Sequence, residues 1–252
     1  MWIPCQETPK FNSAASCDLL EIYRKGTESR IREECARVKS RTFSPSGFRC
    51  LRYQWFKLRG VTPDVIPSPD LAMDFMAEIG TSVHKRVQRT LVNALGDDWI
   101  PVDKYLRMNP IKFPYRIDGN NEEYETFISI DSPPVRFACD GIIRICGKLY
   151  LLEIKSCDRI QSLEKPKDSH IDQVQCYSAL LGLHNVLMLY VDRQTGDTKC
   201  FEVKVTDDEQ GGVIEKMYYT MDMVEKNIAP EKLSVGAYMC SNCPYQVKCK
   251  EW

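Results

Sequence analysis

Two apolar runs separated by a short turn constrain the fold of this chain most. Residues 135–146 and 149–156 are rich in Val, Ile, Leu and Phe, and they flank Gly147 and Lys148. Runs of this length and composition on either side of a glycine-containing turn predict a β-hairpin. Asp140, Glu153 and Lys155 lie within these apolar runs, and burying a charge without a partner is costly. These residues must therefore contact one another or a bound ion.

The pairing of the hairpin predicts where the three charges point. If Gly147 and Lys148 form a two-residue turn, Asp140 lies opposite Lys155, and Glu153 lies opposite Ile142. Directly paired residues share a face of the sheet, and so do residues two apart on one strand. Asp140, Glu153 and Lys155 are therefore expected on one face, provided that the register does not slip by one residue.

Two carboxylates beside a lysine suit metal-assisted hydrolysis of a phosphodiester. Asp140 and Glu153 offer hard oxygen ligands for Mg²⁺ or Mn²⁺, which can activate a water molecule and neutralise charge on a phosphate. Lys155 can position that water or stabilise the transition state. From these three residues alone, a plain carboxylate–lysine ion pair in a solvated strand pair remains an equal alternative.

The rest of the chain predicts an α/β protein with a mixed sheet. The apolar pattern after residue 71 repeats at three- and four-residue steps and marks the most secure helix, which carries Gly80 and His84. An exposed helix over 18–39 is weakened near Gly26, and 96–134 gives weak signals with one strand around 111–117. The expected helices span 44–56, 72–95, 169–183 and 207–226, and the remaining strands span 186–192 and 198–205.

The charge balance excludes a globally basic protein. Lys and Arg number 34 against 35 Asp and Glu, so any nucleic-acid site must be a local patch. The basic, aromatic segment near residue 50 is the candidate, with four residues expected to contact DNA: Arg49, Arg52, Tyr53 and Lys57. No apolar run is long enough to span a bilayer, and the start lacks an export signal. We expect a cytoplasmic protein, or one in the host cytoplasm if the source is viral.

The order of the motifs resembles a known nuclease family. Gly80 with His84, then Asp140-Gly141, then Glu153-x-Lys155, then Gln173 with Tyr177 follow one another as in the RecB-like branch of the PD-(D/E)XK nucleases. The resemblance implies a restriction-endonuclease-like core, in which helices flank a mixed central sheet, plus an iron–sulfur-stapled helical region. It covers a nuclease domain at 44–252, preceded by a helical extension at 1–43.

The resemblance also assigns roles to residues. It implies that His84, Asp140, Glu153 and the carbonyl of Ile154 bind Mn²⁺ or Mg²⁺. It implies catalytic roles for Asp140, Glu153 and Lys155, and it implies that Gln173 and Tyr177 hold the active site and the DNA.

Twelve cysteines are many for 252 residues, and three of them cluster near the C-terminal end. Clustered thiols in a reducing compartment favour a metal or an iron–sulfur cluster over disulfides. The spacing resembles the iron–sulfur staple of the AddB nuclease domain and of the CRISPR-associated RecB-family exonucleases. It implies a [4Fe–4S] cluster on Cys50, Cys240, Cys243 and Cys249, with zinc in a Cys₄ site as the alternative.

The expected function is a metal-dependent DNA nuclease. We expect an exonuclease on single-stranded ends that acts in replication, recombination, repair or CRISPR adaptation, with a helicase or a CRISPR integrase as a possible partner chain. The alternative is a scaffold or adaptor that binds DNA ends through the same site without cutting them.

Overall fold

The central sheet has five strands and mixed direction. The computed structural model describes residues 14–36, 40–64, 71–121, 124–233, 240 and 243–251. The sheet order is β1 (Trp99–Ile100), β5 (Gly141–Ile145), β6 (Lys148–Cys157), β7 (Asn185–Asp192) and β8 (Thr198–Lys204). β6 and β7 run parallel, and the other neighbouring pairs are antiparallel. The mixed sheet predicted from the sequence is confirmed.

Helix α5 (Asp168–Leu181) connects the two parallel strands, as a parallel pair requires. It follows the short 3₁₀ helix η3 (Ile160–Ser162) and ends at Gly182, whose φ of +70° suits a helix terminus. The buried side of α5 packs with Ile142, Leu151 and Met188 in the main core. This side of the sheet therefore carries α5, and α6 (Asp207–Glu225) packs against α5 in turn.

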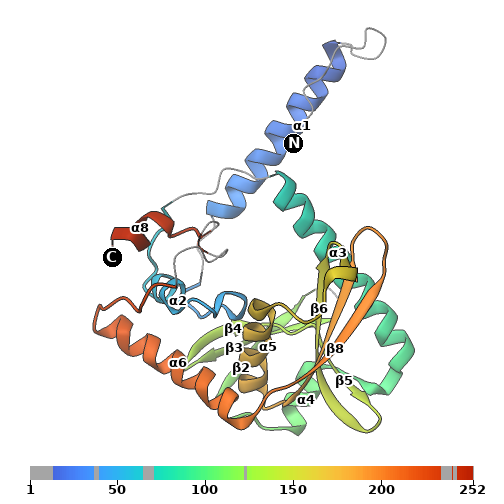
Figure 1. The fold of residues 1–252 in the computed structure, drawn as a ribbon, viewed down its shortest axis with the longest axis vertical. Coiled ribbons are helices and arrows are strands. Elements are labelled where there is room, and N and C mark those ends of the chain that lie inside the picture. The colour runs from blue at the N-terminus through green and yellow to red at the C-terminus, as the bar shows by residue number, and fades with distance from the viewer. Residues whose placement is uncertain are drawn as a thin grey trace.

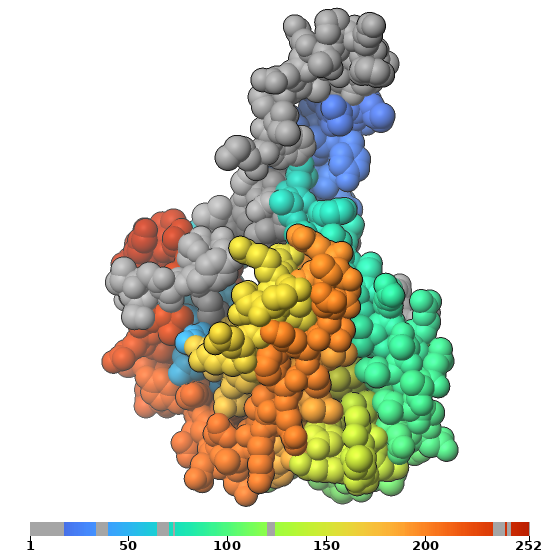
Figure 2. All heavy atoms as spheres, turned by 45° about the vertical axis from the view of Figure 1, so that its right-hand side comes forward, coloured from blue at the N-terminus to red at the C-terminus, as the bar shows by residue number. Residues whose placement is uncertain are grey.

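Helix α3 (Leu71–Leu95) covers the other side of the sheet and lies along one flank of the molecule (Figures 1 and 2). Its Val83, Val87 and Leu91 pack in a second core cluster with Leu152 and Ile154. Because strand residues alternate between faces, Leu151 and Glu153 face α5 while their neighbours face α3. The sequence prediction of helices flanking a mixed sheet is confirmed.

A second sheet was missed by the sequence analysis. It has three antiparallel strands, β2 (Tyr115–Asn121), β3 (Glu125–Asp131) and β4 (Pro134–Phe137), and it follows η2 (Gly96–Asp98) and α4 (Val102–Met108). The strand predicted near 111–117 overlaps β2 only at 115–117, because β2 is mostly polar and contains a register shift after Ile117. Pairing with β3, rather than local propensity, determines β2.

The N-terminal helix α1 (Ala14–Ala36) projects from the body above the first turns of α3 (Figures 1 and 2). It is one continuous helix, so the predicted weakness at Gly26 does not interrupt it. Arg30 of α1 forms ion pairs with Asp74 and Glu78 of α3. Residues 37–39, where the predicted helix ended, lie outside the described residues. Phe43 is buried in the main core and bridges to Val135.

The segment predicted as one helix over 44–56 is two helices. A 3₁₀ helix, η1 (Pro45–Gly47), follows Ser44, and α2 (Leu51–Leu58) begins after Cys50. The Cys50 sulfur accepts a hydrogen bond from the N–H of Tyr53 and caps α2, so Cys50 lies at the helix start. Helix α8 (Gln246–Glu251) lies on the same side of the molecule as α2 (Figure 1). Among the described helices, none combines the length and apolarity that crossing a membrane requires.

Candidate active site

The hairpin register differs from the prediction, yet the expected faces survive. The turn consists of Cys146 and Gly147, both at positive φ, and Gly141 pairs with Leu152. Asp140 precedes β5 at the position opposite Glu153 rather than Lys155. The observed pairing is thus shifted by two residues from the predicted register. Because side chains alternate between the two faces of a strand, a shift of two leaves each residue on its predicted face.

Asp140 lies where helix α3 meets the hairpin. Its Oδ2 accepts a hydrogen bond from the Ile154 N–H at 2.6 Å, and its Oδ1 lies 3.1 Å from His84 Nδ1. The Asp140 backbone carbonyl accepts a bond of 2.8 Å from Gln88, a buried side chain that the sequence analysis did not single out. Both carboxylate oxygens and the carbonyl are thus engaged, which fixes Asp140 in place.

A chain of polar side chains links β6 to α5. The Lys155 ammonium lies 2.6 Å from Glu153 Oε1 and donates to Gln173 Oε1 at 2.9 Å. Gln173 Nε2 then donates to the Tyr177 hydroxyl at 2.9 Å. Gln173 and Tyr177 are four residues apart, so they share one face of α5. The structure brings together the lysine, the carboxylate and both α5 residues.

Burial and the neighbouring charges shift the pKa values of several residues in this site. Burial and the neighbouring Asp140 raise the pKa of Glu153 to about 7, although Lys155 opposes the shift. Burial alone would lower the pKa of His84, but the hydrogen bond and charge of Asp140 outweigh it and the pKa is raised. Burial also raises the pKa of Tyr177, which therefore stays protonated. A cation between the carboxylates would relieve the repulsion that drives the Glu153 shift.

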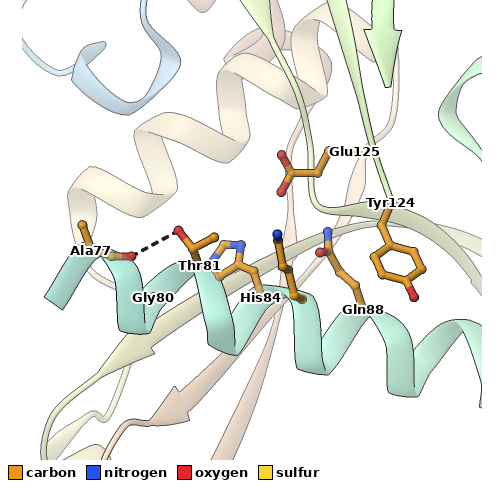
Figure 3. Close-up of a pocket in the computed structure, with 8 residues that line it drawn as sticks. Ala77, Gly80, Thr81, His84, Gln88, Tyr124 and Glu125 are labelled. Carbon is orange, nitrogen blue, oxygen red and sulfur yellow. Dashed lines mark hydrogen bonds between the residues drawn. The ribbon is translucent and has the colours of Figure 1, made fainter. Parts of the chain in front are cut away.

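One further potential metal ligand, Glu125, was not predicted from the sequence. Ligand atoms of His84, Glu125 and Asp140 all lie within 4.8 Å of one another. Glu125 begins β3 and faces His84 across a pocket (Figure 3). It lies in the polar region 96–134, where no motif marked it, so only the three-dimensional pairing of β3 could reveal it. The predicted ligand Glu153 instead pairs with Lys155, and Ile154 contributes its N–H to Asp140.

The four predicted cluster cysteines come together at the edge of the molecule. Burial raises the pKa values of Cys50 and Cys243, and the other cysteines of the set raise them further, so the four thiols lie close enough to interact electrostatically. Cys243 and Cys249 pack against an aromatic cluster that includes Phe56 and Tyr245. The donor set, four thiols from two remote segments, fits a thiolate-bound metal or iron–sulfur cluster.

The residues predicted to contact DNA have different surroundings. Arg52 is buried and donates to the Pro230 carbonyl at 2.6 Å, so its guanidinium supports the fold and is not presented to solvent. Tyr53 packs against Tyr245 beside the cysteines. Arg49 is exposed and forms ion pairs with Asp168 and Asp172 of α5. Lys57 is half-buried. The expected basic patch is thus reduced to Arg49 and Lys57.

Solved structures resemble this chain in part or over most of its length, although no family model and no curated protein matches the sequence. The crystal structure of SSO0001 superposes with a TM-score of 0.52 over 92% of this chain and 97% of that chain, at 16% identity. The alkaline exonuclease LHK-Exo from Laribacter hongkongensis gives a TM-score of 0.33 over 50% of this chain and 64% of that chain, at 15% identity. LHK-Exo in complex with dAMP gives 0.41 over 70% and 78%, at 14% identity. At 16% identity the similarity to SSO0001 concerns the fold alone.

Proposed function

We propose that this protein is a metal-dependent nuclease that hydrolyses phosphodiester bonds in DNA. The observation that carries the proposal is the buried pair of Asp140 and Glu153, with the pKa of Glu153 raised to about 7, in contact with His84 on one side and Lys155 on the other. A buried, crowded carboxylate pair is unfavourable unless a cation binds there. The same groups are those that metal-assisted hydrolysis requires.

The side chains divide the work between binding and positioning. Asp140, Glu153 and His84 are the proposed ligands, with the Ile154 carbonyl and Glu125 as further candidates. A bound Mn²⁺ or Mg²⁺ would supply Lewis acidity toward the phosphate and acidify a water molecule. Fixed contacts orient the protein groups, since the Ile154 N–H holds Asp140 in place.

Lys155 is the proposed electrostatic catalyst. Its ammonium donates to both Glu153 and Gln173, which hold it beside the carboxylates. Gln173 is held in turn by its bond to the Tyr177 hydroxyl, which burial keeps protonated. An ammonium fixed in a water-poor site stabilises developing negative charge on a phosphate better than a mobile one.

The four cysteines are proposed to bind a [4Fe–4S] cluster, with zinc as the alternative. Cys50 caps α2, and the other three lie near the C-terminal end, so a shared cluster would join segments about 190 residues apart. The proposed role is structural, because the described contacts of these cysteines are with an aromatic cluster rather than with the acidic site.

The proposed substrate is a single-stranded DNA end, cut exonucleolytically in replication, recombination, repair or CRISPR adaptation. This finer proposal rests on the order of motifs shared with RecB-like nucleases. A helicase or an integrase is the kind of partner chain that would use such an activity.

The test is digestion of end-labelled single-stranded DNA with Mn²⁺ by wild type and two lysine variants. Lys155→Ala should lower the rate by about 10²-fold or more because it removes transition-state stabilisation. Lys148→Ala is the matched control, since Lys148 lies on the same strand and pairs with Glu202 on the surface. Equal rates for all three proteins would contradict the mechanism. DNA binding by a wild type that never cuts would favour the scaffold.

A further inference from the structure

We propose that the pocket between α3 and the start of β3 binds one unpaired nucleotide at the end of the DNA strand. The inference deepens the proposed nuclease function and rests on it. The pocket has a volume of about 330 Å³, near the lower limit for small-molecule sites. Such a volume is large enough for one nucleotide.

The wall formed by α3 is lined by small side chains. Ala77, Gly80 and Thr81 lie at three- and four-residue spacing, so they share one face of the helix. Figure 3 shows this face turned toward the pocket, with His84 one turn further along. A large side chain at any of these positions would fill the space that the nucleotide needs.

The opposite wall offers a stacking surface and the rim offers a charge. Tyr124 lines the pocket, and its ring is held edge-on by Trp99, with ring centroids 6.4 Å apart. Aromatic rings bind unpaired bases by stacking with little regard to sequence. The exposed Lys85 also lines the pocket and supplies a positive charge for the phosphate backbone.

The pocket and the candidate metal ligands share residues. His84 and Glu125 line the pocket and also belong to the group with Asp140 whose ligand atoms lie within 4.8 Å. A nucleotide seated here would place its phosphodiester beside those ligands. Hydrolysis would add the hydroxyl of water to phosphorus, break the P–O bond to the rest of the strand and leave the proton on the departing oxygen. The products would be one nucleoside monophosphate and a strand one nucleotide shorter.

The test measures binding of dAMP and dTMP in the presence of Mn²⁺ by calorimetry. Wild type should bind both, because stacking does not select a base. Ala77→Trp should weaken binding by about tenfold or more because the indole occupies the pocket. Ala94→Trp is the matched control: Ala94 is an exposed alanine on the same helix and does not line the pocket.

A second variant keeps the test valid if the first fails to fold. Tyr124→Leu should weaken binding by about 5-fold to 100-fold, as expected for loss of one base–aromatic stack. Unchanged affinity in both variants, or no binding by wild type, would overturn the pocket proposal. Nucleotide binding that these variants abolish, in a protein that never cuts DNA, would instead contradict the proposed function and leave the pocket proposal standing.

Discussion

The acidic site and the cysteine set are built in opposite ways. The acidic site lies within the sheet, where Glu153 is 2% exposed and Asp140 7% exposed, and burial there raises the pKa of Glu153. The cysteines lie at the edge, where Cys50 and residues 240–249 meet beside aromatic side chains. The first region places charges where the fold disfavours them. The second joins remote segments, so its ligand would stabilise the fold.

Replacing the buried carboxylate should produce the largest effect and the clearest contrast. Glu153→Gln should lower the cleavage rate by about 10³-fold because it removes a metal ligand. The melting temperature of the metal-free protein should change little, since relief of the repulsion between Glu153 and Asp140 offsets the loss of the ion pair with Lys155. Calorimetry and the digestion assay measure both quantities. A large fall in melting temperature with full activity would contradict this prediction, because it would mean that Glu153 serves stability rather than catalysis.

Breaking the cysteine set should give the reverse pattern. Cys249→Ser should lower the melting temperature by roughly 5–10 °C because it opens a closure of about 190 residues. The rate per folded molecule should change little. Cys200→Ser is the matched control, because Cys200 is an exposed thiol on β8. Equal melting temperatures in the two variants would contradict a structural role for the cluster.

The metal-free protein should lose stability as pH rises from about 5 to 8. Glu153, with a pKa near 7, holds a proton in the folded state that the unfolded chain has released above pH 4.5, so folding takes up a proton. The raised pKa of His84 acts in the same direction. Melting in EDTA across this range measures the slope. The pH dependence should be weaker in Glu153→Gln. A melting temperature of the wild type that rises with pH would contradict the raised pKa of Glu153.

The ion pairs of Arg49 connect the two regions, and removing them should change stability and activity least. Arg49 precedes Cys50 and pairs with Asp168 and Asp172 on α5, the helix that carries Gln173. These pairs are partly exposed, so Arg49→Gln should cost only about 0–1 kcal/mol. A rate loss of a few fold at unchanged DNA affinity would indicate that the pairs position α5. A change in DNA affinity that salt abolishes would instead restore the predicted DNA contact.

The sequence predicted what local patterns determine. The apolar periodicity located α3, and the alternation in the hairpin put Asp140, Glu153 and Lys155 on one face despite a wrong register. It could not find Glu125 or the sheet that carries it, because β2 is polar and depends on its partner strand. It misjudged Arg52 because that arginine is buried and donates a hydrogen bond to the carbonyl of Pro230, a residue distant in the sequence. Long-range packing leaves no local signal.

Binding of Mn²⁺ tests the central claim most directly, because it needs neither substrate nor cluster. Calorimetric titration should show binding to wild type and a loss of about tenfold or more in Asp140→Asn, since Asp140 joins both candidate ligand groups. Asp98→Asn, at a surface carboxylate paired with Arg144, should bind as wild type does. Equal affinity in Asp140→Asn and wild type would contradict the metal site on which the proposed nuclease rests.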